Sequence, residues 1–359
     1  MTREAYLRHV GSLQQMAYTR QCVIEEGRAS HLRCVEVKND ALRFLVLGDK
    51  ALDIGQLEYR GRTVSFTSKP GLNGRNPFDT NGLEAQRSIM GGLFFTCGFE
   101  NICAPREIAG KQYPMHGRIR TTPAEHLSAD AFWENGQYVL QVSGEMREAE
   151  LFGENLALRR TIRTVLGSTK IIIRDEVTND TPQEAPMMLL YHCNFGFPFL
   201  SEGARLILPS KAVTPRDPMP DETLAAWSRV GAPVDGAPEE VFIHDLAADA
   251  DGNTFAAIEN AAQDLAVVIR FSKKQLPYFM QWKSPASGDY VIGMEPSNCL
   301  VYGREYHEKR GDLPMLAPFA SKTFEWSFEL LEGAAVDALR AQCGALLTTS
   351  NQSDKEDLS

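Results

Sequence analysis

The sequence predicts an all-β protein that is mainly antiparallel and has a few short helices. From residue 32 onward, short segments of alternating polarity are separated by turns roughly every 8–12 residues, a rhythm typical of sandwiches and barrels. Residues 156–163 alternate in polarity, turn at 166–168 and return at 169–177, which indicates an antiparallel hairpin with one solvent-exposed face. The apolar run 189–198 indicates a strand buried on both faces.

Composition and charge limit the classes of function. Of the 359 residues, 43% are hydrophobic and 23% are charged, as in ordinary soluble globular proteins. The net charge of −10 argues against nucleic acid or an anionic membrane as a partner. No apolar stretch is long enough for a transmembrane helix, the N-terminus lacks a secretory pattern, and the seven cysteines are scattered. We expect a cytoplasmic protein with no nucleic-acid or membrane partner, and we leave a homodimer open.

The chain divides into three parts around one domain. Residues 1–30 are expected to form a helical or extended segment that packs on the domain, and residues 31–332 form the β-domain itself. Residues 333–359 are expected to hold a C-terminal helix, predicted at 334–346, and a disordered polar tail. No internal repeat or sharp linker divides the β-domain.

Strands and long loops can be placed along the β-domain from patterning and turn residues. Residues 69–88 are rich in Gly, Asn and Pro and are predicted to form a long binding loop. Residues 210–238 are rich in Pro, Asp and Ala and are predicted to run over the surface. Short strands are expected at 41–47, 51–59, 63–67, 138–146, 240–245, 254–259, 265–271, 278–282 and 323–331.

Three segments carry candidate chemistry. His192 lies inside the buried apolar run, where a lone histidine is more often a hydrogen-bonded core residue than a functional group. Two other segments change that balance: His116 is followed by Gly117, and Glu295 begins the sequence Glu-Pro-Ser-Asn. A histidine that titrates near neutrality and a carboxylate form an efficient pair for general acid–base chemistry.

These segments, in this order, resemble the galactose mutarotase-like superfamily of aldose 1-epimerases, and the resemblance covers about residues 42–331. It implies a β-supersandwich fold, with His192 as the catalytic acid, Glu295 as the base and His116 as a sugar contact. It also suggests a divergent branch, described largely as a domain of unknown function.

The chain departs from the family at one motif. Aldose epimerases carry an arginine that touches the sugar, but Cys97 or Gly98 stands at that position here. The polar residue Asn101 remains nearby and is a candidate substrate contact. Arg118, close to His116, is a candidate replacement for the missing cation.

Three further residues, His244, Gln281 and Lys283, are predicted to hold substrate hydroxyl groups, with Trp282 as an apolar platform. A strand with one core tryptophan and two exposed polar neighbours explains residues 281–283 equally well. His244-Asp245 also matches a metal-dependent phosphohydrolase pair, although a single such dipeptide is a weak signal. No zinc-ligand spacing occurs, so we expect neither a metal nor another cofactor.

The function expected from these residues is an isomerase, an aldose 1-epimerase acting on a small-molecule carbohydrate in carbohydrate metabolism. Anomer interconversion requires one proton delivered to the ring oxygen and one removed from the anomeric hydroxyl. Two alternatives stay open: a non-catalytic carbohydrate-binding protein on the same scaffold, and an isomerase or epimerase acting at another position of a sugar or sugar phosphate. A sugar phosphate would require basic side chains at the site, for which the candidates are Arg118, Lys283, Arg304 and Arg310.

Overall fold

Antiparallel ladders build every sheet in the computed structural model, which describes residues 1–74 and 82–356. The predicted all-β, antiparallel class is therefore confirmed. The described residues form three larger sheets and three two-stranded ribbons.

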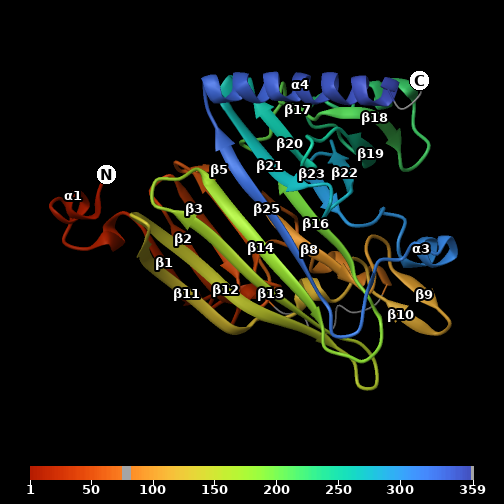
Figure 1. The fold of residues 1–359 in the computed structure, drawn as a ribbon, viewed down its shortest axis with the longest axis horizontal. Coiled ribbons are helices and arrows are strands. Elements are labelled where there is room, and N and C mark those ends of the chain that lie inside the picture. Colours follow the sequence, from red (N-terminus) through yellow and green to blue (C-terminus); the bar gives the residue numbers. More distant parts are fainter. Residues whose placement is uncertain (75–81, 357–359) are drawn as a thin grey trace.

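The largest sheet has eight strands and forms one layer of the sandwich (Figure 1). Its central hairpin was predicted from the polarity of residues 156–177. In spatial order its strands are β11 (Glu125–Glu134), β12 (Gln137–Ala149), β13 (Asn155–Val165), β14 (Lys170–Asn179), β25 (Ser321–Leu331), β21 (Leu265–Ser272), β20 (Asn253–Asn260) and β17 (Arg205–Ile207).

The six-stranded sheet lies behind the large sheet in Figure 1 and carries the segments that the sequence singles out. In spatial order its strands are β18 (Ser210–Pro215), β19 (Glu240–Leu246), β22 (Tyr278–Ser284), β23 (Val291–Ser297), β16 (Met188–Phe195) and β8 (Phe94–Phe99). The segment predicted to run over the surface therefore contributes an edge strand, β18, to this sheet.

A five-stranded sheet from the N-terminal part completes the larger sheets. Its strands are β1 (Tyr18–Val23), β2 (Arg33–Lys38), β3 (Leu42–Leu47), β4 (Asp53–Tyr59) and β5 (Arg62–Thr63). The ribbons pair β6 (Phe66–Thr67) with β7 (Gly91–Gly92), β9 (Arg106–Ile108) with β10 (Lys111–Tyr113), and β15 (Ala185–Pro186) with β24 (Met315–Leu316).

Helices are short except at the C-terminal end. The α-helices are α1 (Arg3–Leu7), α2 (Asp221–Ala225), α3 (Arg304–Arg310) and α4 (Ala334–Glu356), and short 3₁₀ helices lie at Leu13–Gln15, Gly27–Ala29, Gly82–Arg87, Ile119–Thr121 and Ala261–Gln263. Helix α4 extends ten residues beyond the predicted end at Leu346, into the segment expected to be disordered. The added residues include no proline or glycine that would end a helix.

Alternating side chains divide the six-stranded sheet into two faces. On β16, Tyr191 and Cys193 join the main core, together with Trp326 and Phe328 of the large sheet. The other face of β16 carries Leu190 and His192 and points away from that core. The six-stranded sheet therefore has one face that packs on the large sheet and a second face that is available for a site.

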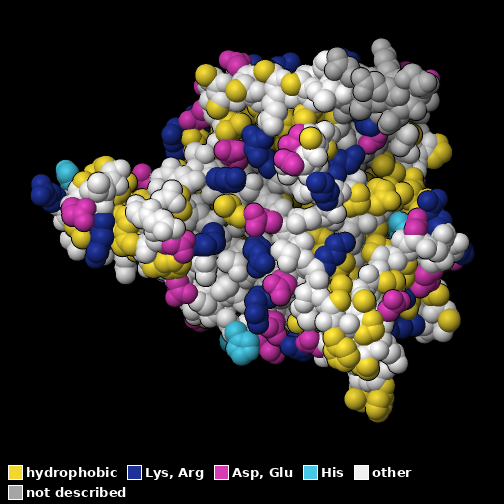
Figure 2. Space-filling model, in the orientation of Figure 1, with side chains coloured by type: hydrophobic (Ala, Val, Ile, Leu, Met, Phe, Trp, Pro, Cys, Tyr) yellow, Lys and Arg dark blue, Asp and Glu magenta, His cyan; other side chains and the backbone are white. Residues whose placement is uncertain are grey.

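The outer face of the large sheet is charged, as expected for an antiparallel sheet with one solvent-exposed side. Figure 2 shows basic and acidic side chains interspersed over this face. Arg147 and Arg159 both pair with Glu145, and Arg163 pairs with Glu134. Helix α4 covers one end of the sheet, where Leu339 packs on strands β20 and β21 (Figure 1). No helix in residues 1–74 and 82–356 is long and apolar enough to span a membrane.

Candidate active site

A cavity of about 790 Å³ lies over the free face of the six-stranded sheet. Strands β8, β16, β22 and β23 each supply lining residues, and the segments on both sides of residues 75–81 contribute Lys69, Pro70 and Gln86. The predicted binding loop therefore borders the cavity, although its central residues lie outside the described part. The side chains that carry chemistry are His116, His192, Asn194, Arg216, Glu239, Trp282 and Glu295.

His192 and Glu295 face each other across neighbouring strands. The register of β16 and β23 pairs Cys193 with Met294, which sets His192 opposite Glu295. Directly opposed residues of an antiparallel pair project from the same face and contact one another. Nε2 of His192 lies 3.1 Å from Oε1 of Glu295. The sequence places these residues about a hundred positions apart, and the sheet brings them together at the cavity.

The side-chain oxygen of Asn194 faces one nitrogen of the His192 ring. The side-chain amide of Asn194 donates to the carbonyl oxygens of His192 (2.9 Å) and Gly92 (3.3 Å). The amide oxygen therefore faces Nδ1 of His192, at 2.7 Å, and accepts a hydrogen bond from it. In the neutral ring, Nε2 then has a free lone pair directed at Glu295, and Oε1 of Glu295 accepts no hydrogen bond from the described residues.

Burial moves the two pKa values in opposite directions. It lowers the pKa of His192 to about 4, with partial compensation from the hydrogen bond to Asn194. It raises the pKa of Glu295 to about 8, and nearby Arg216 opposes that rise. At neutral pH the pair therefore holds one proton, mainly on Glu295. Because the two groups lie in contact, this proton can pass between them and be exchanged with a substrate.

Aromatic rings and a second histidine enclose the pair. Phe95 stacks on the His192 ring with a centroid distance of 4.5 Å, and Trp282 meets the same ring edge-on at 5.3 Å. The His116 ring lies 5.6 Å from that of His192. The backbone N–H of Cys103 donates to Nδ1 of His116 (3.3 Å), so Nε2 carries the proton when this ring is neutral. Burial, together with His192 and Arg120, lowers the pKa of His116 well below its usual value.

Arg216 lines the cavity and brings a guanidinium close to Glu295. It comes from the segment after β18 and is held by Asp217 (2.6 Å) and Glu239 (3.1 Å). The other oxygen of Glu239 accepts a hydrogen bond from Nε1 of Trp282 (2.9 Å). This chain of contacts runs along one side of the cavity and ends at the ring that touches His192.

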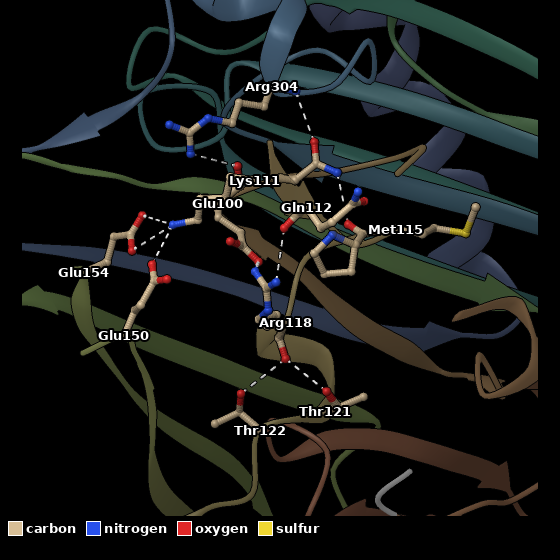
Figure 3. A network of polar contacts seen from close by, with 12 residues as sticks. Glu100, Lys111, Gln112, Met115, Arg118, Thr121, Thr122, Glu150, Glu154 and Arg304 are labelled. Carbon is tan, nitrogen blue, oxygen red and sulfur yellow. Dashed lines mark hydrogen bonds and ion pairs between the residues drawn. The ribbon is translucent and has the colours of Figure 1, made fainter. Parts of the chain in front are cut away.

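The structure does not bring Arg118 into the cavity lining. As Figure 3 shows, Arg118 pairs with the buried carboxylate of Glu100 and donates to the carbonyl oxygen of Gln112 (3.1 Å). In the same view Lys111 reaches Glu150 (2.6 Å) and Glu154 (3.3 Å). These contacts tie the chain around Arg118 to neighbouring strands and loops.

Four other predicted contacts also lie outside the cavity lining. Asn101 donates to the carbonyl oxygens of Ala104 and Pro114, both at 3.0 Å. Nε2 of His244 lies 3.1 Å from the Gln281 side-chain oxygen, and Lys283 pairs with Glu240 at 2.9 Å. Within the described residues, no group of three or more His, Cys, Asp and Glu side chains suits a metal ion.

Sequence reasoning missed Asn194, Arg216 and Glu239. Asn194 could have been found, because residues two apart on a strand share a face and His192 was already singled out. The same alternation places Trp282 on the cavity side and turns its neighbours Gln281 and Lys283 away. Arg216 and Glu239 follow and precede strands within a polar segment that shows no motif.

Comparison with known proteins agrees with this architecture. The model of the family described as a domain of unknown function (DUF4432) matches residues 29–330. A candidate aldose 1-epimerase from Klebsiella pneumoniae has a similar structure, with a TM-score of 0.86 and 25% identity over 92% of this chain and 87% of that one.

More distant structures share the fold. A galactose mutarotase-like protein from Clostridium acetobutylicum has a TM-score of 0.61 and 15% identity, covering 89% of this chain and 100% of its own. Galactose 1-epimerase from Lactobacillus acidophilus has a TM-score of 0.56 and 13% identity, covering 88% of this chain and 99% of its own. No curated protein matches by sequence. The chain belongs to the DUF4432 family, and it shares its fold with galactose mutarotase-like proteins.

Proposed function

We propose that this protein is a sugar isomerase of the aldose 1-epimerase type, which interconverts the anomers of a small sugar. The observation that carries the proposal is the pairing of His192 and Glu295, 3.1 Å apart on the wall of one cavity. The ring oxygen and the anomeric hydroxyl of a sugar are bonded to the same carbon. Two closely spaced groups that exchange protons therefore match the two atoms that must gain and lose a proton.

The reaction moves one proton each way. The proton that Glu295 holds at neutral pH first passes to Nε2 of His192, 3.1 Å away, which leaves a carboxylate and an imidazolium. Glu295, as a carboxylate, then removes the proton of the anomeric hydroxyl while the bond from the anomeric carbon to the ring oxygen breaks. The electron pair of that bond goes to the ring oxygen, which takes the proton from Nε2 of His192. Ring opening leaves an aldehyde, protonated Glu295 and neutral His192, the protonation state that burial favours. Rotation of the aldehyde and reversal of these steps closes the ring as the other anomer.

Other cavity residues supply orientation. The Nε2–H group of His116 is a hydrogen-bond donor, and the Trp282 ring offers an apolar surface for a sugar face. Arg216 and Glu239 offer a guanidinium and a carboxylate to hydroxyl groups. We assign Arg216, rather than Arg118, as the cation that compensates for the missing arginine of the family motif.

The charges around the cavity favour a substrate without a phosphate group. Among the described residues, three cationic side chains line it, Lys69, Arg106 and Arg216, against the three carboxylates of Asp217, Glu239 and Asp289, and the carboxyl group of Glu295 is mainly protonated at neutral pH. Lys69 pairs with Asp289 at 2.5 Å, and Arg216 pairs with two of the others. The four cations considered for a sugar phosphate are outside the lining, and each has a carboxylate partner.

The test is NMR exchange spectroscopy on a panel of neutral aldoses, uronic acids and sugar phosphates, observing anomer interconversion with and without the protein. We expect enhanced exchange for at least one neutral aldose and little or none for sugar phosphates. Binding of a sugar without enhanced exchange would favour the carbohydrate-binding alternative. Conversion of a sugar into an epimer at another carbon would favour the alternative of an isomerase or epimerase that acts at another position of the sugar.

A further inference from the structure

Asn194 stands beside the proposed catalytic pair, yet none of its polar atoms is free for a substrate. Its amide nitrogen donates to the carbonyl oxygens of His192 and Gly92, and its oxygen receives the hydrogen bond from Nδ1 of His192. The residue is 1% exposed, and its backbone N–H donates to the carbonyl oxygen of Leu93 (2.8 Å). Whatever Asn194 contributes to a reaction therefore passes through His192.

The orientation of the Asn194 amide follows from its partners. Carbonyl oxygens only accept hydrogen bonds, so the two that Asn194 meets require its NH₂ group on their side. Gly92, which supplies one of them, has φ of 84°, in the region that favours glycine. The oxygen of the amide must then point at Nδ1 of His192, and an oxygen that only accepts selects the ring form with the proton on Nδ1.

We propose that Asn194 is a positioning residue: it holds His192 in the Nδ1–H form and thereby reserves Nε2, the atom facing Glu295, for proton exchange with the substrate. This proposal rests on the proposed function. In the opposite form, Nε2–H would point at Glu295 and Nδ1 would meet the Asn194 oxygen with no proton between them. The neutral ring could then not accept a proton at Nε2, and His192 could not return to the protonated form that acts as the acid.

Within the described part of the chain, few ionisable groups face the His192 ring, so the effect of Asn194 can be isolated. Glu295 faces it from β23, and His116 faces it from the turn after β10. The other close neighbours, Phe95 on β8 and Trp282 on β22, do not titrate. Arg216 and Glu239 act on Glu295, the first lowering and the second raising its pKa.

The direct test is long-range ¹H–¹⁵N correlation NMR on protein labelled at histidine, which distinguishes the two forms of a neutral ring without any substrate. We expect His192 with the proton on Nδ1 in the wild-type protein. In Asn194→Leu we expect a substantial share of the Nε2–H form. A wild-type His192 with its proton on Nε2 would overturn the proposal. This measurement does not depend on turnover. It can therefore support or overturn the role of Asn194 even if the proposed function fails.

Kinetics give a second readout once a substrate is known. We expect Asn194→Leu to lower kcat about 10- to 100-fold, the loss typical when the partner that orients a metal-binding histidine is removed. KM should stay within about twofold because Asn194 does not touch substrate. The hydrogen bond from Asn194 raises the pKa of His192. The acid limb of the kcat profile should therefore move to lower pH in Asn194→Leu and to higher pH in Asn194→Asp, whose carboxylate stabilises the imidazolium.

A matched control separates positioning from packing. Asn260 is also 1% exposed and donates to a backbone carbonyl oxygen, that of Phe199 (2.8 Å), but it contacts no histidine. Asn260→Leu should lose stability while its pH profile stays that of the wild type. Equal kcat losses in the two leucine variants, with unshifted acid limbs, would overturn the proposal. If Asn194→Leu does not fold, the wild-type NMR result and the shift in Asn194→Asp still decide it.

Discussion

At the scale of single residues, burial sets the protonation of His192 and Glu295. Both side chains are nearly enclosed, and aromatic rings replace the water that would otherwise solvate a charge. The neutral forms are therefore favoured, which raises the pKa of the carboxyl and lowers that of the imidazole. Because the groups touch, their titration belongs to the pair and not to either residue alone.

A bell-shaped pH dependence of kcat follows from this pairing. Below pH about 4 both groups are protonated and no base remains, and above pH about 8 both have lost the proton and no acid remains. We expect activity between these limits, measured as the anomer exchange rate after subtraction of the buffer-catalysed rate. A rate that stays level from neutrality to well above pH 8 would contradict the assignment.

Arg216 provides a test of the substrate contacts. Arg216→Lys should raise KM about tenfold, since a hydrogen bond to a charged group contributes about 1.5–3 kcal/mol and is shared by the ground and transition states. Arg216 lowers the pKa of Glu295, so a lysine whose ammonium group lies farther from Glu295 should also shift the alkaline limb of the pH profile to higher pH. The control is Arg310→Lys, which alters an exposed pair with Asp312 outside the cavity lining. Equal KM values for the two variants would show that Arg216 does not contact the substrate.

At the scale of elements, strand register positions the proposed catalytic pair. The buried run around His192 and the strand of Glu295 could be recognised from sequence, because apolar patterning marks strands. Their adjacency could not, since patterning says which face a residue occupies but not which strands pair. The edge strand β18 was harder to predict, because it and the residues after it resemble a loop in composition. Its pairing with β19 brings the following residue, Arg216, to the site.

Beneath the site, a buried ion cluster joins three sheets. Arg160 on β13 is fully buried and pairs with Asp175 on β14 (2.5 Å) and with Asp53 on β4 (2.6 Å). The hydroxyl of Tyr191, next to His192 on β16, donates to Asp175 (2.7 Å). The side chain and backbone N–H of Thr96 on β8 both donate to Asp53. The cluster therefore connects the five- and eight-stranded sheets to two strands of the site.

Removing Arg160 should be strongly destabilising. Arg160→Leu leaves two buried carboxyl groups without their cation, and breaking such a cluster costs about 3–5 kcal/mol in the free energy of unfolding. Chemical denaturation at neutral pH measures this loss. The control is Arg163→Leu on the same strand, which breaks an exposed pair with Glu134 and should cost no more than about 1 kcal/mol. Similar losses in both variants would show that the buried cluster contributes no more to the free energy of unfolding than an exposed ion pair does.

At the scale of the whole molecule, fold class was more predictable than site composition. The alternation and turn rhythm of a sandwich are spread over some three hundred residues, so errors at single strands do not change the class. A site depends on a few side chains brought together from distant segments. His116, His192 and Glu295 could be predicted because a family resemblance names them, whereas Arg216 and Glu239 reach the cavity through the path of one surface segment.

The extent of the terminal elements was also hard to predict. Helix α4 continues to Glu356 through a polar stretch whose composition is shared by helices and disordered tails. Residues 1–30 include β1, an edge strand, alongside the short helix α1. Residues 1–30 thus contain both a helical and an extended segment, and neither they nor helix α4 contribute to the described lining of the cavity.

The most direct measurement compares anomer exchange rates of the wild-type protein, Glu295→Gln and His192→Asn on the same sugar. Each variant removes one of the two groups that exchange protons, so each should lower kcat by about 10²- to 10⁴-fold while the protein remains folded. Glu259→Gln, at a buried carboxylate paired with Arg205 and Arg340 outside the cavity, serves as the control and should keep the wild-type rate. Full exchange rates in Glu295→Gln would contradict the assignment of the base, and with it the proposed acid–base pair.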